Sequence, residues 1–430
     1  MAKYKEKISF FQKYLVWVIA IGPLFTQYVA FLDFILIPEL LIIPTIPICI
    51  IKRKKINTGV FKPLIFYLYT VFLLTLLAIL LQQNVNISVA ATAFARFSVY
   101  VLIIIFISST NFNIDYGSKV VVIVAAFNSI YGIIQYGAYT LYGKVLPWHL
   151  SFLKVKYGTK LIQEHQYYFS EFGYRFSGLF SEPAHFSQYV SFALLIVLFF
   201  KSEKFNLGKF TRVFLAILYS FVMILNGSGT GFAMLIFIFG LFTIKNITRK
   251  NKNALDLLIK FSVIIGIGIS VFFIVNSTIL SNGYTRISKI SQESTTNVRV
   301  LRPFEVYYNI PTINKLIGVG YANYSTYVVN SGMASNYELM ANSAWTNTIG
   351  YVLVGSGLIG FTTYSWFYIK LLKSTKGFYK YLVLMLIVFA FFTEVPLSFQ
   401  FVTIMSYILQ GVLQSNLSSE MDKFSISRES

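Results

Sequence analysis

The chain has 430 residues, of which 56% are hydrophobic, 18% aromatic and only 12% charged. Soluble domains carry about 25% charged residues, so this composition excludes an ordinary soluble protein and predicts an integral membrane protein. The formal net charge of +20 does not indicate nucleic-acid binding, because most basic residues stand in short clusters between apolar runs. The apolar runs are continuous rather than alternating, which predicts helical spans.

We predict an all-α polytopic membrane protein with about twelve transmembrane helices, since one span needs about 20 residues. The predicted spans, in chain order, are 10–29, 34–51, 63–82, 88–107, 119–141, 183–200, 213–226, 229–244, 257–276, 345–369, 381–393 and 397–414. Four of these are short and are alternatively tilted or re-entrant hairpins, which gives a range of ten to twelve spans. The first apolar run lacks a small-residue cleavage site and is predicted to be an uncleaved anchor.

The basic residues predict the orientation, because cytoplasmic segments carry an excess of lysine and arginine. With a cytoplasmic N-terminus, 25 of the 36 basic residues fall on the cytoplasmic side, ten fall in outer loops and Arg96 lies within a span. Both termini are therefore predicted to be cytoplasmic. All ten outer basic residues fall in two long extracytoplasmic loops, 142–182 (loop A) and 277–344 (loop B), of a single membrane domain, 1–430. Loop B is long enough to form a small cap with one or two helices.

The sequence RFSGLFSEPAHFSQY, residues 175–189, leads from the end of loop A into the predicted span 183–200. Pro183 suits the first turn of a helix, and Ser181 or Glu182 suits its N-cap. His185 would then lie in the first turn, beside the carboxylate of Glu182. A capped helix start with a histidine at the membrane interface is the structural alternative.

These residue types suit a site that binds a pyrophosphate and takes a proton from a hydroxyl group. A carboxylate or an imidazole, here Glu182 or His185, can take a proton from a hydroxyl group. An arginine, here Arg175, can hold a pyrophosphate with a bidentate fork. Ionisable groups at a membrane boundary are expensive to keep there and indicate a functional site.

Loop B contains a second basic sequence, NVRVLRPFEVYYNIPTINKLIGVGYANYS, residues 297–325. Arg299 and Arg302 are three residues apart and would share one face of a helix. Pro303 can start a helix and leave Arg302 near its N-cap. Paired arginines outside a membrane suit a lipid-linked phosphate, and solvated loop charges are the alternative.

Two further sequence features place polar or charged residues between or within apolar runs. Residues 226–231 read NGSGTG between two short spans and predict either a tight hairpin turn or an anion-binding nest of backbone N–H groups. Arg96 lies in the middle of a span, where it would face the protein interior. It is predicted either to pair with a carboxylate, Asp33, Glu39 or Glu394, or to contact substrate.

The chain resembles bacterial polysaccharide polymerases of the Wzy type, within the O-antigen polymerase and ligase superfamily. The resemblance rests on the many spans, on a large outer loop before a late span, and on three local patterns. These patterns are Arg175-Phe-Ser-Gly-Leu-Phe-Ser-Glu182-Pro183, the pairing of Arg299 with a later Gly318-Val-Gly320, and Ala341-Asn342-Ser343 leading into Gly355-Ser-Gly357-Leu-Ile-Gly360. The ligase branch carries a histidine where Ala341 stands, which favours the polymerase branch.

The resemblance implies a glycosyltransferase in the bacterial cytoplasmic membrane, acting on its outer face on undecaprenyl-pyrophosphate-linked repeat units. It implies no cofactor and no metal ion, in keeping with the lack of a D-x-D pair in the outer loops. Arg175, Arg299 and Arg302 would bind the pyrophosphate, and Glu182 or His185 would be the base. Arg96 and Asn342 are further candidates. The lipid bilayer, a chain-length regulator and a flippase are the implied partners, and nucleic acid is not.

Three other functions remain open at this stage. A polysaccharide ligase of the same superfamily would move finished polymer to another acceptor. A non-enzymatic flippase or transporter would carry charges along a central cavity and would show two related halves, neither of which is evident. A peptidoglycan polymerase shares a multi-span body with a large outer loop, but its motifs are not matched here.

Overall fold

The structure, a computed structural model, describes residues 8–30, 35–51, 59, 61–81, 85–109, 112–156, 174–247, 301–334, 338–339, 344, 346–393 and 398–413. Throughout these ranges helices are the regular elements, and one isolated β-bridge joins Val29 to Leu36. The prediction of an all-α chain is confirmed for the described residues. The predicted span 257–276 lies outside them.

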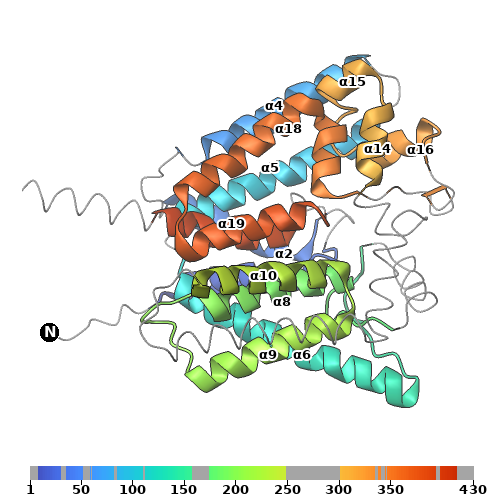
Figure 1. The fold of residues 1–430 in the computed structure, drawn as a ribbon. Helices are drawn as coiled ribbons and strands as arrows, with labels where there is room; N and C mark the ends of the chain where they lie inside the picture. The colour runs from blue at the N-terminus through green and yellow to red at the C-terminus, as the bar shows by residue number, and fades with distance from the viewer. Residues whose placement is uncertain are drawn as a thin grey trace, which may run out of the picture. The chain divides into compact units, whose positions relative to one another are not determined.

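Five helices among the described residues are long and apolar enough to cross a membrane. They are α4 (Lys62–Leu81), α5 (Ile87–Ser109), α6 (Ile114–Tyr142), α9 (Lys209–Asn226) and α18 (Thr348–Ser374) (Figure 1). Shorter apolar helices are α8 (Pro183–Phe199), α10 (Gly229–Ile247), α19 (Gly377–Ala390) and a helix at Phe399–Leu413.

The first two predicted spans are more broken than the sequence suggested. Helix α1 (Phe10–Ile21) continues into the 3-10 turn η1 (Gly22–Phe25), and the chain then turns back instead of remaining helical to residue 29. The return segment contains two short helices, α2 (Ile37–Ile42) and α3 (Thr45–Ile51). Pro44 stands between these two helices, and its missing backbone N–H explains the interruption.

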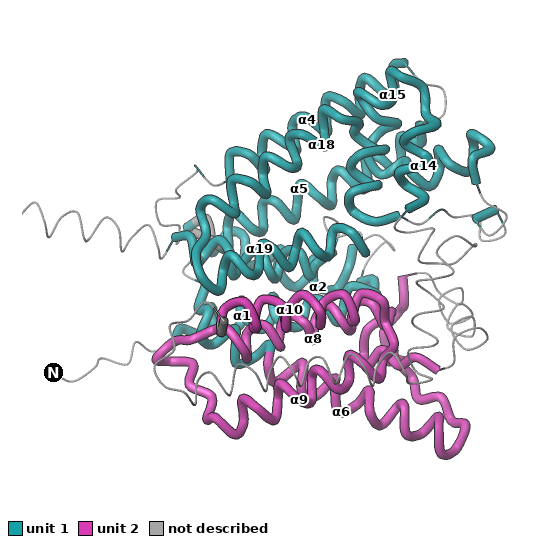
Figure 2. The backbone as a smooth tube through the Cα atoms, in the orientation of Figure 1, with its two compact units in different colours: residues 1–121, 298–430 teal, residues 122–297 magenta. Residues whose placement is uncertain are grey.

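The chain divides into two compact units, residues 1–121 with 298–430 and residues 122–297 (Figure 2). In the first unit, α4 and α18 pack side by side, and α5 packs on α4 (Figure 1). In the second unit, α8 packs on both α9 and α10. Fifteen of the 17 residues of α8 are buried, as expected for a mostly apolar helix that packs against two neighbouring helices.

The described part of loop B forms three short helices, where the sequence predicted one or two. They are α14 (Arg302–Asn309), α15 (Thr312–Ile317) and α16 (Tyr324–Asn330), and α14 and α15 pack against α18. Pro311 separates the first two, and Gly318, with φ +84°, ends the second. Because neither a proline nor a left-handed glycine continues a helix, the loop is cut into short pieces.

Candidate functional site

The candidate site is built on the segment before α8, where two amide side chains of α6 hold the backbone. Gln135 Oε1 accepts a hydrogen bond from the N–H of Gly178 at 2.9 Å, and Gln135 Nε2 donates to the carbonyl of Gly178 at 3.0 Å. Asn128 Oδ1 accepts from the N–H of Leu179 at 3.1 Å. Gly178 has φ +59°, and a Cβ there would lie 3.1 Å from Asn128 Oδ1. Glycine is therefore required by the conformation and by the close approach.

Asn226, the last residue of α9, holds the same segment through a different contact. It is fully buried, donates a hydrogen bond from Nδ2 to the carbonyl of Phe176, and accepts one from Ser187 Oγ at 3.1 Å. Gly227 follows with φ +65° and ends α9, so the NGSGTG motif forms the hairpin turn between α9 and α10. Gly231 lies against Ser187, where a Cβ would come within 2.9 Å of its Oγ. The turn thus holds the loop A motif against α8.

Aromatic rings fill the remaining space around the segment. Phe176 packs edge-on against Phe186 of α8 with ring centroids 5.5 Å apart, and Tyr174 stacks on Tyr139 of α6 at 4.4 Å. Burial, together with the neighbouring phenols of Tyr131 and Tyr139, raises the pKa of Tyr174 to about 12. Tyr174 is therefore a neutral phenol that packs, and it is not a base at ordinary pH.

The ionisable residues predicted for loop A lie at the two ends of this fixed segment. Pro183 is the first residue of α8, as predicted, and Glu182 rather than Ser181 occupies the N-cap position. The side chain of Glu182 does not cap the helix. Ser181 Oγ lies 3.4 Å from His185 Nδ1. Arg175, Glu182 and His185 are all half-buried, so each presents part of its side chain to its surroundings.

Arg302 lies in a network of contacts within loop B. Its guanidinium donates to Glu305 at 2.9 Å and to the carbonyl of Met333, and its Nε lies 3.8 Å from a carboxylate oxygen of the fully buried Glu338. Arg302 therefore joins α14 to the segments around Met333 and Glu338. Its positive charge compensates the buried carboxylate of Glu338. Its role as a pyrophosphate ligand stays a prediction.

Arg96 pairs with Glu39, one of the three carboxylates that the sequence offered. Arg96 Nε lies 2.9 Å from Glu39 Oε1, and the Tyr100 hydroxyl donates to the same oxygen at 2.9 Å. The other oxygen of Glu39 accepts from the N–H of Leu36 at 2.9 Å. The carboxylate is satisfied by these bonds, which supports the pairing interpretation of Arg96.

Four of the candidate site residues and possible Arg96 partners named from the sequence lie outside the described residues. They are two site candidates, Arg299 and Asn342, and the two other carboxylates considered for Arg96, Asp33 and Glu394.

The two glycine motifs of the resemblance pack directly on each other. A Cβ on Gly318 would lie 2.4 Å from the carbonyl oxygen of Gly355, and one on Gly357 would lie 2.3 Å from a carbonyl oxygen of α15. Gly357 has φ +62° and interrupts the helical backbone of α18. The N–H of Val319 donates to the carbonyl of Val354 at 2.9 Å, beside this interruption. Backbone therefore meets backbone here, which only glycine permits.

Sequence reasoning missed the amides of Asn128 and Gln135 and the anchoring role of Asn226. A signal was present, because Asn128 and Gln135 are seven residues apart in an apolar helix and so lie on one face, two turns apart. Polar side chains repeated on one face of a membrane helix indicate a buried partner.

No protein-family model matches the chain, and no match is found among curated proteins.

Proposed function

We propose that the chain is a membrane glycosyltransferase that polymerises undecaprenyl-pyrophosphate-linked repeat units into surface polysaccharide. The observation that carries the proposal is the fixed segment from Arg175 to Glu182. Three buried amides hold its backbone between an arginine and the first turn of α8, where Glu182 and His185 lie. A catalytic group must be held in place by its surroundings to act in a defined geometry, and this segment has that support.

In the proposed reaction a hydroxyl oxygen of one repeat unit forms a bond with the anomeric carbon of the growing chain. The bond between that carbon and the pyrophosphate oxygen breaks, and undecaprenyl pyrophosphate leaves with the electron pair. Glu182 or His185 takes the hydroxyl proton. Arg175 binds the pyrophosphate through its planar fork and stabilises the charge that develops on it. Arg299 and Arg302 of loop B are the further candidates for this role.

The proposal includes a complete topology of about twelve spans in a bacterial cytoplasmic membrane. Both termini would be cytoplasmic, and loops A and B would lie on the outer face. Basic residues between the apolar helices support this orientation. A chain-length regulator and the flippase that delivers repeat units are the proposed partners.

The direct test is substitution of Arg175 in cells that carry this chain as their source of the activity. Arg175→Ala should abolish long polymer while protein levels stay normal. Lys144→Ala is the matched control, because Lys144 is an exposed cation at the end of α6 in the same loop. Normal polymer length and yield with Arg175→Ala, at normal protein levels, would overturn the proposal.

Two substitutions decide which residue takes the proton. Glu182→Gln and His185→Asn each remove one candidate base with little change in size. The variant that removes the base should lose polymer by about 100-fold or more, whereas the other should retain most of it. Retained activity in both variants would exclude this segment as the source of the base.

A strain that lacks the chain separates the proposal from its rivals. Single repeat units in place of long polymer are expected for a polymerase. Long polymer that remains lipid-linked would indicate a ligase. Lipid-linked units trapped on the cytoplasmic face would indicate a flippase.

A further inference from the structure

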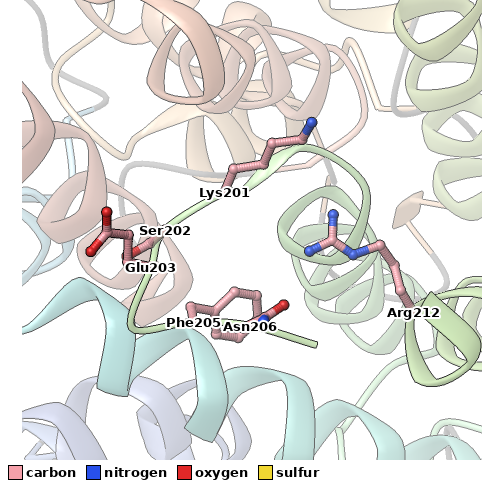
Figure 3. Close-up of a pocket in the computed structure, with 6 residues that line it drawn as sticks. All are labelled: Lys201, Ser202, Glu203, Phe205, Asn206 and Arg212. Carbon is pink, nitrogen blue, oxygen red and sulfur yellow. The ribbon is translucent and has the colours of Figure 1, made fainter. Parts of the chain in front are cut away.

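A basic cavity lies at the other end of α8 from the candidate site. Its volume is about 390 Å³. It lies between the end of α8 and the first turn of α9, and Figure 3 shows the side chains that line it. The lining residues are Lys201, Ser202, Glu203, Phe205, Asn206 and Arg212. Since α8 has 17 residues, its two ends are separated by about 25 Å. The cavity therefore cannot serve the fixed segment before α8.

The charge around this cavity is strongly positive. The segment 201–212 holds four cations, Lys201, Lys204, Lys209 and Arg212, against the single carboxylate of Glu203. Figure 3 shows Glu203 on the opposite side of the view from Arg212. These like charges repel one another, and a bound anion would relieve that repulsion.

A fifth cation approaches the same region from α10. Lys245 Nζ lies 5.1 Å from the centre of the Phe199 ring, at the end of α8. The cations thus come from the connecting loop, from α9 and from α10, and they converge on one end of the second unit.

An apolar stripe on α9 begins beside the cavity. Its members follow helical spacing and are all exposed, namely Phe210, Val213, Phe214, Ile217 and Phe221. Phe210 is 85% exposed and lies in the first turn of α9, two residues before Arg212. Because α9 is apolar enough to cross a membrane, this stripe is suited to contact with acyl chains.

We propose that this cavity binds the phosphodiester head group of an anionic phospholipid, whose acyl chains lie along the exposed stripe of α9. Arg212 offers a planar fork to the phosphate, and Lys201 offers a second positive charge. Ser202 and Asn206 add uncharged donors at the same cavity. The stripe favours a lipid over a free phosphate, because acyl chains would cover the apolar side chains and a soluble anion would leave them exposed.

The test measures lipid binding to the purified full chain by native mass spectrometry after delipidation. The probes are phosphatidylglycerol, zwitterionic phosphatidylcholine and inorganic phosphate. The variant Lys201→Gln/Arg212→Gln should bind phosphatidylglycerol about 30-fold more weakly than the unaltered chain, since each basic group near a membrane surface contributes roughly a fivefold factor. The control Lys373→Gln/Lys376→Gln removes the same charge from exposed lysines that do not line the cavity, and it should bind normally.

Three results would overturn the proposal. Unchanged phosphatidylglycerol binding in the cavity variant would remove the site, and equal weakening in the control would reduce it to general surface attraction. Full displacement of the lipid by inorganic phosphate would show a site for the soluble anion. If the double variant unfolds at a lower temperature than the unaltered chain, the single variant Lys201→Gln replaces it. Its affinity for phosphatidylglycerol should fall about fivefold. None of these measurements depends on the polymerase assignment.

Discussion

Replacing Gln135 by methionine tests whether the amides of α6 hold the candidate site in place. The change keeps the length of the side chain but removes both of its hydrogen bonds to Gly178 and its bond to the carbonyl of Pro147 at 3.2 Å. Gln135 is 1% exposed, so water cannot replace these bonds. The Pro147 carbonyl keeps a bond from the Tyr131 hydroxyl at 2.6 Å, so the loss falls mainly on Gly178.

The magnitude follows from the groups left without a partner. An unsatisfied buried N–H costs about 1–3 kcal/mol, and the carbonyl adds a comparable or smaller cost. We expect Gln135→Met to lower the free energy of unfolding by about 2–5 kcal/mol. The backbone amides of Gly178 and Leu179 should also exchange hydrogen faster, because they lie in the segment that loses its anchor.

The assay combines thermal unfolding in detergent, hydrogen exchange and polymer length in cells. Thr140→Val is the matched control on the same helix, because the Thr140 hydroxyl bonds only to carbonyls within α6 and is exposed. Its expected effect is below about 0.5 kcal/mol. Normal unfolding temperature and normal exchange at Gly178 in Gln135→Met would refute the reasoning.

Three further predictions follow from the described contacts. Gly357→Ala should lower the free energy of unfolding by at least about 3 kcal/mol, because its φ is +62° and a Cβ would meet a carbonyl oxygen at 2.3 Å. Gly240→Ala is the control, because Gly240 lies in open space within α10. It should be neutral or slightly stabilising in thermal unfolding. Glu39→Ala should cost about 3–5 kcal/mol, since it leaves Arg96 without this carboxylate, and a double-mutant cycle with Arg96→Ala that gave additive losses would contradict the pairing. Tyr174→Phe should leave the pH profile of polymer formation unchanged between about pH 6 and 9, because a phenol with a pKa near 12 remains protonated there; a shifted profile would show that this hydroxyl titrates in the working range.

Helix starts could be predicted well where a local signal sets them. Pro183 marks the beginning of α8 because proline fits the first helical turn, and the long apolar run of α4 is a helix as its composition requires. Pro44 was a sequence signal for the interruption between α2 and α3, although the apolar run across it suggested one continuous span. Local sequence signals therefore predicted where the helices lie more reliably than where they are interrupted.

The candidate site was predictable only in part. Arg175, Glu182 and His185 stand out in the sequence because ionisable groups are rare beside an apolar run. The amides that hold their segment do not stand out, because an asparagine or glutamine in a membrane helix gives no sign of which backbone it contacts. Gln135 and Gly178 are 43 residues apart, and their pairing depends on how α6 meets the segment before α8.

The sequence by itself determined the helical, membrane-type character of the chain, because composition and the length of apolar runs act locally. The tertiary structure decided which polar groups meet. In the folded chain Arg96 pairs with Glu39, and Arg302 makes its contacts within loop B. The glycine motifs of loop B and α18 pack with their backbones in direct contact. The physical reason is that a buried polar group or a closely packed glycine is satisfied by a partner distant in sequence, and only the packed chain supplies that partner.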